Sequence, residues 1–303
     1  MIAGIDIGGT KIAIGLVDDE GAVVAQERVP VNPELGPASA SKRIEDVLRK
    51  MLRSTALQLD GIGIACTGPV DPISGEMGDV NTLRGWMGWN PVNELSAAFG
   101  VRAAMENDAD AAALGEARWG VGRGRKSLIS ITVGTGIGAG VILDGRVLRG
   151  VGGSHPEIGH HIIDPSGPLC TCGTHGCWES LASGPALEKW YHEQNPDGER
   201  KSGREICALA REGDGHALAA VVRLRKYLGI GVSNVVSMFV PEVIALSGSV
   251  MQSADLLLDE IRDAVRVNCT LVPAAQCEIL MSSLGSNAGL IGAVQVWHSR
   301  VHA

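Results

Sequence analysis

The sequence lacks the features that would direct it to nucleic acid or to a membrane. Across 303 residues the formal net charge is −8, and the densest basic stretch is only Arg123-Gly-Arg125-Lys126. Nucleic acid is bound by long arrays of Lys and Arg, so such a partner is disfavoured. No uncharged apolar run reaches the roughly 18 residues that a membrane helix needs. The N-terminus contains Asp6 and Lys11 and has no basic leader, so we expect a cytoplasmic protein.

Low-complexity segments and short repeats are also missing, and the composition is that of a globular protein. Hydrophobic residues make up 45% of the chain and charged residues 20%, which allows a real core and excludes intrinsic disorder. Glycine is abundant, at 41 residues, and it clusters in short runs between apolar segments. Such runs are typical of tight loops that bind a phosphate or another ligand.

Strand-like and helix-like segments alternate along the chain. We expect strands at 2–7, 12–18, 22–29, 61–66, 101–105, 127–133, 138–143, 242–247 and 277–281. Helices are expected at 39–58 and 108–119, through most of 184–238 with a break at 194–203, after 249, and from the 285–289 turn onward. The Gly-rich hairpin pattern of the N-terminus begins again near residue 127, which indicates a second, related half.

This alternation predicts an α/β architecture with two layered lobes and a cleft between them. We expect a small α/β domain formed by 1–119 with 290–303, and a large α/β domain formed by 120–289. Sites in such folds collect in the loops at the strand ends.

Two Gly-rich turns are candidates for holding a polyphosphate. In Asp6-Ile-Gly-Gly-Thr-Lys11 the glycines permit close approach of the backbone to a phosphate, and successive N–H groups can bind an anion. Asp6 cannot bind phosphate itself and is suited to hold Mg²⁺ through water. Such a turn alone could be a plain hairpin. The second turn, at 134–138, favours the phosphate interpretation.

Asn107-Asp108 stands at a predicted strand-to-helix junction, where two interpretations compete. Asn and Asp cap helices well, and capping is the simpler explanation. Alternatively Asp108 accepts a proton from an attacking hydroxyl, as an Asp does in kinases. The two roles are compatible if Asn107 caps the helix and Asp108 points towards the substrate.

Cysteine occurs seven times, at an odd count that does not suggest a disulfide framework. Three of the thiols, Cys170, Cys172 and Cys177, lie in one short run after a pair of histidines at 160 and 161. Three thiolates and one imidazole complete a tetrahedral Zn²⁺ site. The spacing does not decide which histidine ligates. Four protein ligands leave no open position, which favours a structural over a catalytic zinc.

The zinc would order a loop rich in Gly and Pro, and thereby position Glu179. Glu157 precedes His160 by three residues. If this segment is extended, Glu157 and His160 can meet only where the chain bends, and Gly159 permits such a bend.

These motifs resemble those of the ROK family of sugar kinases and repressors, over essentially the whole chain. Asp6–Lys11 and Gly134–Gly138 resemble its two phosphate motifs, and Glu157-x-Gly-His160 with Cys170-x-Cys172-Gly-x-x-Gly-Cys177-x-Glu179 resembles its signature. The resemblance implies a two-lobed, actin-like or ribonuclease H-like ATPase fold. It also implies ATP, Mg²⁺ and structural Zn²⁺ as cofactors, and a homodimer.

The resemblance also implies roles for individual residues. Asp108 is implied as the catalytic base, and His160 as a zinc ligand beside the three cysteines. The implied sugar ligands are Gly68, Asn81, Asn107, Asp108, Glu157, His160 and Glu179. The implied nucleotide and phosphate contacts are Asp6, Gly8, Gly9, Thr10, Lys11, Gly134, Thr135, Gly136, Gly138 and Gly248. Ser249 departs from the family pattern, in which many members carry glycine.

The resemblance narrows the substrate without fixing it. Asn81-Thr-Leu-Arg-Gly-Trp86 and Cys177-Trp-Glu179 resemble the glucokinases of the family, whereas His155-Pro156 resembles its fructokinases. We therefore expect ATP-dependent phosphorylation of a hexose at the 6-hydroxyl, with glucose as the first candidate. Fructose, mannose and N-acetylhexosamines are the alternatives, and polyphosphate is an alternative donor.

A sugar-sensing regulator without catalytic activity is the alternative from another class. Repressors of the family carry a DNA-binding segment ahead of the phosphate motif, which begins here at Asp6. The intact phosphate motifs and Asp108 favour an enzyme.

Overall fold

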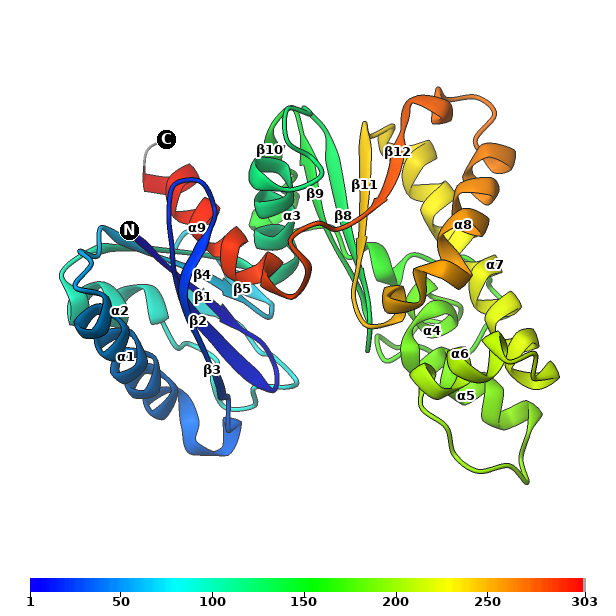
Figure 1. Ribbon diagram of the computed structural model, residues 1–303, viewed down its shortest axis with the longest axis horizontal. Coiled ribbons are helices and arrows are strands. Elements are labelled where there is room, and N and C mark those ends of the chain that lie inside the picture. Colours follow the sequence, from blue (N-terminus) through cyan, green and yellow to red (C-terminus); the bar gives the residue numbers. More distant parts are fainter. Residues whose placement is uncertain (302–303) are drawn as a thin grey trace. The chain divides into compact units, whose positions relative to one another are not determined.

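The computed structural model describes residues 1–301, and the chain divides into two compact units (Figure 1). The first unit comprises Met1–Gly124, Gly140–His155 and Ser283–Ala303, and the second comprises Arg125–Ala139 and Pro156–Ser282. Each has its own core. The functional domain limits expected above stay a prediction.

The first sheet has five strands in the order β3-β2-β1-β4-β7. The strands are β1 (Ile2–Ile7), β2 (Lys11–Val17), β3 (Val23–Pro30), β4 (Gly61–Cys66) and β7 (Arg102–Asn107). β1, β4 and β7 are parallel, while β2 pairs antiparallel with β1 and β3 pairs antiparallel with β2. The carboxyl ends of the three parallel strands therefore meet at one edge of the sheet.

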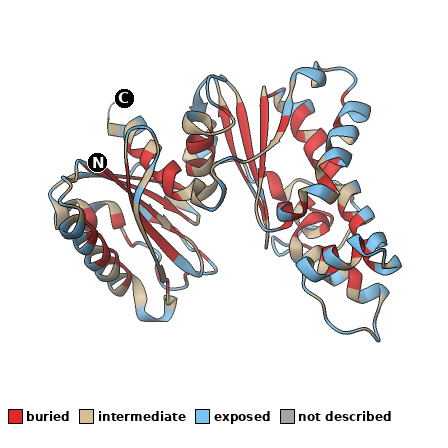
Figure 2. Cartoon of the chain, in the orientation of Figure 1, coloured by how far each residue is buried: buried red, intermediate tan, exposed pale blue. Residues whose placement is uncertain are grey.

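Helices cover both faces of this sheet, as the alternation of its side chains requires. On β1, Ala3, Ile5 and Ile7 pack with buried residues of α1 (Gly36–Thr55) and α2 (Pro91–Phe99). Ile2 faces the other way and packs with α9 (Ala288–Val301), which runs beside α3 (Asp108–Trp119). Figure 2 shows the sheet buried between these helices.

Glycines let α9 lie directly on the sheet. A Cβ atom at Gly4 would be 2.3 Å from the backbone oxygen of Leu290, and one at Gly63 would be 1.7 Å from that of Ala293. Real Cβ atoms do not approach so closely. These two strand glycines are therefore required for the close contact between helix and backbone.

The second sheet repeats the order of the first. Its strands are β8 (Leu128–Val133), β9 (Ile137–Leu143), β10 (Arg146–Val147), β11 (Val243–Ser247) and β12 (Glu278–Met281), in the order β10-β9-β8-β11-β12. β8, β11 and β12 are parallel. In both sheets the first strand lies centrally, with its hairpin partner on one side and later parallel strands on the other. The expectation of a second, related half is thus confirmed.

Five α-helices belong to the second unit: α4 (Trp178–Ala182), α5 (Gly184–Gln194), α6 (Gly203–Arg211), α7 (Gly215–Phe239) and α8 (Ala254–Asn268). Short 3₁₀ turns occur at Pro33–Leu35, Val151–Gly153, Ile158–His160, Val250–Ser253, Ala274–Gln276 and Gly285–Asn287. A two-stranded hairpin, β5 (Val70–Asp71) and β6 (Glu76–Met77), completes the first unit. Among residues 1–301, no helix has the length and apolar run needed to cross a bilayer.

The α/β class is confirmed, and the expected strands lie within a few residues of those observed. The sequence analysis did not foresee α2, the β5–β6 hairpin, β10 or α4. It also missed a second break in the helical region, at 212–214, where Asp214 caps the start of α7 by accepting a hydrogen bond from the Ala217 N–H.

Candidate functional site

The predicted residues of the first unit gather at the carboxyl edge of its sheet. Asp6 is near the end of β1, Gly68 follows β4, and Asn107 ends β7. The register pairs Ile7 with Cys66 and Cys66 with Asn107, so the three strand ends are level. This is the edge at which open α/β sheets bind ligands.

Asn107 caps α3, as the capping interpretation required. Its side-chain Oδ1 accepts hydrogen bonds from the N–H groups of Ala109, at 2.9 Å, and Asp110, at 3.4 Å. The neighbouring Asp108 also accepts from the Ala109 N–H, through Oδ1 at 2.8 Å. The capping amide and the carboxylate are separate side chains, so capping does not use up Asp108.

Asp108 is partly buried, and burial raises the pKa of its carboxyl from 3.8 to about 7. The negative charges of Asp6 and Asp110 raise this pKa further, while the Ala109 N–H and His155 lower it. Burial likewise raises the pKa of Asp6 to about 6, against the lowering effect of Lys11. A carboxylate with a pKa near neutrality is suited to accept a proton.

Asp6 lies beneath the beginning of α9. A Cβ atom at Gly289 would be 2.6 Å from the Asp6 carboxylate, so a glycine is required there. The first turn of a helix carries a partial positive charge that favours an anion. At the turn of the β1–β2 hairpin, the Gly8 N–H donates to the Lys11 carbonyl at 3.0 Å. Thr10 and Lys11 are exposed.

The two remaining predictions of the first unit fall in loops at the same edge. A Cβ atom at Gly68 would be 2.7 Å from the side-chain nitrogen of Asn107, so this loop lies against the cap. Asn81 is exposed. Its neighbour Thr82 lies against Gly9, because a Cβ atom at Gly9 would be 3.0 Å from the Thr82 side chain.

The sequence analysis missed a group of charged residues around this junction. Glu106 and Asp110 are buried, and Arg149 forms an ion pair with each of them. A signal was present: Glu106 directly follows the apolar run Ala103-Ala-Met105, and a buried carboxylate requires a partner. The identity of that partner could not be read from the sequence.

In the second unit, the predicted glycine loop lies at the carboxyl end of β8. The Gly134 N–H donates to the Gly136 carbonyl at 2.8 Å, and the Ile137 N–H donates to the Glu179 carboxylate at 2.9 Å. At the end of the neighbouring β11, Gly248 has φ +99°, and a Cβ atom there would be 2.2 Å from the Val133 oxygen. The structure therefore brings Gly134, Gly136, Gly248 and Glu179 together.

The chain bends between Glu157 and His160, as the glycine between them permits. Residues Ile158–His160 form a 3₁₀ turn, and a Cβ atom at Gly159 would be 2.0 Å from the Ile137 oxygen. The segment is thus not a strand. His161 turns away from the cysteines: its Nε2 lies 3.3 Å from the side-chain nitrogen of Asn234, and its ring packs 5.5 Å from Trp178.

The four predicted metal-ligating side chains do converge. One ligand atom from each of His160, Cys170, Cys172 and Cys177 lies within 4.8 Å of every other. His160 Nδ1 is 3.5 Å from Cys170 Sγ, and Cys172 Sγ is 3.5 Å from Cys177 Sγ. The latter distance is far longer than the roughly 2.05 Å of a disulfide. It suits two sulfurs that share a tetrahedral ion with bonds of about 2.3 Å.

The environment of the thiols also suits a metal. A hydrogen bond from the Thr174 backbone N–H lowers the pKa of Cys172 to about 7, which favours the thiolate that metals bind. Burial raises the pKa of Cys177, so a cation that binds this sulfur must displace the thiol proton. Three sulfurs and one nitrogen, with no fifth protein group required, fit Zn²⁺.

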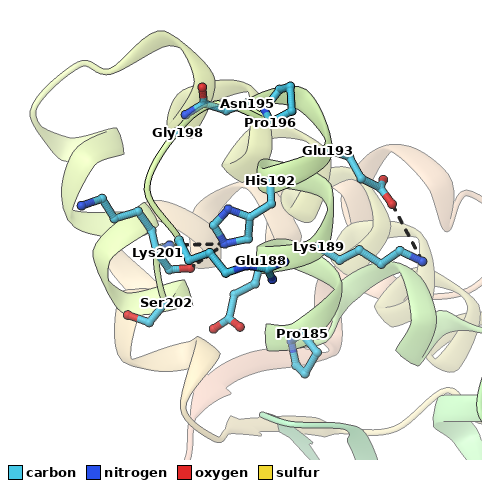
Figure 3. A pocket seen from close by; sticks show the side chains of 11 residues that line it. Pro185, Glu188, Lys189, His192, Glu193, Asn195, Pro196, Gly198, Lys201 and Ser202 are labelled. Atoms are coloured by element: carbon cyan, nitrogen blue, oxygen red, sulfur yellow. Dashed lines mark hydrogen bonds and ion pairs between the residues drawn. The ribbon is translucent and has the colours of Figure 1, made fainter.

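A separate pocket of about 740 Å³ lies along α5 (Figure 3). One wall is a face of α5 that includes Glu188 and His192, and the other is the loop through Lys201. His192 Nε2 lies 3.1 Å from the Lys201 carbonyl oxygen. None of the predicted site residues lines this pocket.

The ROK family model matches residues 2–300, and the chain belongs to the ROK family. It is 31% identical to a glucokinase of Streptomyces coelicolor, over 97% of this chain and 96% of the relative. It is also 33% identical to a xylose repressor of Bacillus spizizenii, over 95% of this chain and 74% of the repressor.

Two solved structures are similar over nearly their whole length. The ROK hexokinase of Thermus thermophilus has a TM-score of 0.86 and 33% identity, covering 99% of both chains. A ROK family glucokinase of Streptomyces griseus, in complex with glucose and AMPPNP, has a TM-score of 0.78 and 33% identity, covering 96% of this chain and 97% of that one. The fold is therefore that of the ROK sugar kinases, the actin-like ATPase class.

Proposed function

We propose that the protein is an ATP-dependent hexose kinase that phosphorylates the 6-hydroxyl of glucose. The observation that carries this proposal is that β1 and β7 end at one sheet edge, where Asp108 directly follows β7 and both burial and the charge of Asp6 raise its pKa to about 7. Similarity to glucokinases, one of them crystallised with glucose and AMPPNP, supports the choice of sugar and donor.

In the proposed reaction Asp108 accepts the proton of the sugar 6-hydroxyl as its oxygen attacks the γ-phosphorus of ATP. The bond from the γ-phosphorus to the bridging oxygen breaks, and ADP leaves. Phosphoryl transfer depends mainly on positioning and charge stabilisation. The capping of α3 by Asn107 fixes the start of the helix that carries the base.

Other residues are assigned to binding. Gly68, Asn81, Asn107, Glu157, His160 and Glu179 are proposed to hold sugar hydroxyls. The loops Gly8–Lys11 and Gly134–Gly138, with Gly248, are proposed to hold the nucleotide phosphates. Asp6 would hold Mg²⁺, which supplies positive charge to the phosphates. His160, Cys170, Cys172 and Cys177 would hold a structural Zn²⁺ that orders the segment preceding Glu179.

A coupled assay of ADP formation tests the proposal, with ATP as donor and glucose, fructose, mannose and two N-acetylhexosamines as acceptors. We expect the highest kcat/KM with glucose. A higher value with another sugar would overturn the choice of glucose. Polyphosphate in place of ATP tests the donor.

A sugar-responsive regulator is the second candidate, because a xylose repressor is 33% identical to the chain. Binding of a sugar by calorimetry without turnover of any sugar would favour that candidate. We further propose that the protein is a cytoplasmic homodimer. Light scattering of the purified protein tests whether it is a dimer.

A further inference from the structure

Arg149 follows β10 and its guanidinium binds two buried acids at once. Its Nη2 atom is 2.5 Å from Glu106 Oε1, and its Nη1 atom is 2.6 Å from Asp110 Oδ2. The side chains of Glu106 and Asp110 are 3% and 0% exposed, so neither carboxylate can rely on water for its charge. The planar fork of an arginine can serve two carboxylates in this way, which a lysine cannot.

The two acids flank the proposed base in the sequence. Glu106 is the second-last residue of β7, and Asp110 is the third residue of α3. Asn107 and Asp108 lie between them. Arg149 therefore bridges the strand-to-helix junction, with one contact on the strand side and one on the helix side.

Two other charged groups lie close to this junction. Arg300 of α9 binds the second oxygen of Glu106 at 2.8 Å. His155 Nδ1 lies 3.7 Å from Asp110 Oδ2. Among the arginines that the structure describes, Arg149 forms ion pairs on both sides of the junction, with Glu106 and with Asp110.

These buried charges are expected to add little to the free energy of unfolding. Removing two carboxylates and a guanidinium from water offsets most of their mutual attraction, and well-packed apolar residues often do as well. Directional ion pairs instead fix the relative orientation of the groups they join. At this junction the orientation that they fix is that of the first turn of α3, which includes Asp108.

We propose that Arg149 is a positioning residue for Asp108. It holds the strand-to-helix junction in the conformation in which the Asp108 carboxylate meets the acceptor hydroxyl. This inference rests on the proposed function, in which Asp108 is the base. The charges of Asp6, His155 and Asp110 also act on the Asp108 carboxyl, and Asp108 lies near the buried thiol of Cys66.

Substitution of Arg149 tests the proposal, with Arg300 as the matched control. We expect Arg149→Gln to lower kcat about 100-fold, because a small displacement of a catalytic group has this effect, while the Kd for glucose by calorimetry changes less than about threefold. Arg149→Lys keeps the charge without the fork and should lower kcat about tenfold. Arg300→Gln leaves the bridge intact and should keep kcat within about threefold of the unsubstituted protein.

Amide hydrogen exchange gives a readout that does not depend on activity. The N–H groups of Ala109 and Asp110 bind Asn107 and Asp108, so Arg149→Gln should speed their exchange at least about tenfold relative to amides of α1. Arg149→Lys serves for the same measurement if the Gln variant does not fold. Exchange that is unchanged at these amides, or a kcat of Arg149→Gln within about threefold of the unsubstituted protein, would overturn the positioning role.

The two proposals can fail separately. If the unsubstituted protein turns over no hexose, the proposed function fails, whereas the exchange measurement still reports whether Arg149 holds the junction. If turnover is present and kcat falls equally in Arg149→Gln and Arg300→Gln, loss of a charge near Glu106 explains the effect and the bridge does not.

Discussion

Replacing Asp108 by asparagine should stabilise the folded protein while abolishing turnover. Burial raises the pKa of this carboxyl from 3.8 to about 7 in the folded state. The folded protein therefore binds this proton more tightly than the unfolded chain does. Consequently the free energy of unfolding falls as the pH rises between these two values.

The pKa difference sets the magnitude. A difference of about 3 pKa units corresponds to about 4 kcal/mol above pH 7, at about 1.4 kcal/mol for each unit. Asparagine keeps the shape without the charge, but it accepts a weaker hydrogen bond from the Ala109 N–H. We therefore expect Asp108→Asn to raise the free energy of unfolding by about 2 to 4 kcal/mol at about pH 8.

Urea unfolding in magnesium-free buffer, followed by tryptophan fluorescence, measures this gain. At about pH 5 the carboxyl is mostly protonated in the folded state, so the gain should shrink by about 2 to 3 kcal/mol. Asp19→Asn changes an exposed carboxylate and should leave the unfolding free energy unchanged at both pH values. A variant no more stable than the unsubstituted protein at about pH 8, or an equal gain at both pH values, would refute the reasoning.

The other predictions concern the pH profile, the metal and the packing of α9. Because kcat/KM reports the free enzyme, it should fall about tenfold per pH unit below an apparent pKa near 7, as Asp108 becomes protonated; a flat profile down to about pH 5 would contradict the base assignment. Cys172→Ser should lower the zinc content by mass spectrometry and weaken glucose binding about tenfold, whereas Cys277→Ser, outside the cluster, should change neither. Full zinc occupancy in Cys172→Ser would remove Cys172 from the proposed ligand set. Gly63→Ala, whose Cβ would be 1.7 Å from a backbone oxygen of α9, should destabilise the protein by at least about 3 kcal/mol in urea unfolding, while Gly215→Ala, with open space around it, should not.

The repeated sheets were predictable because their signals are local. Apolar strands joined by Gly-rich hairpins occur twice in the sequence, and the structure gives both copies the same strand order. α2 was missed although Asn90-Pro91 is a typical helix start, in which Asn90 caps the helix and Pro91 is its first residue. This helix has only nine residues, too few to establish a clear periodicity.

The residues of the candidate site were likewise predictable where they lie close together in the sequence, and not where only the fold brings them together. The proposed zinc ligands Cys170, Cys172 and Cys177 are close in sequence, so a short loop brings them together. Choosing His160 over His161 required the 3₁₀ turn, which sends the two rings in different directions. The bridge from Arg149 joins residues about 40 positions apart along the chain, and only the packing of β7, α3 and the loop after β10 brings them together.

The position of α9 in the chain has a consequence for how the protein is made. This helix covers the sheet formed by the N-terminal residues, but the ribosome produces it after the second unit. Until then the outer face of β1, with Ile2 and Gly4, lacks its cover, and the second unit has already been synthesised. Until α9 emerges, the nascent N-terminal segment therefore exposes an apolar surface to chaperones or to other chains. A stop codon directly before α9 would leave that surface uncovered permanently.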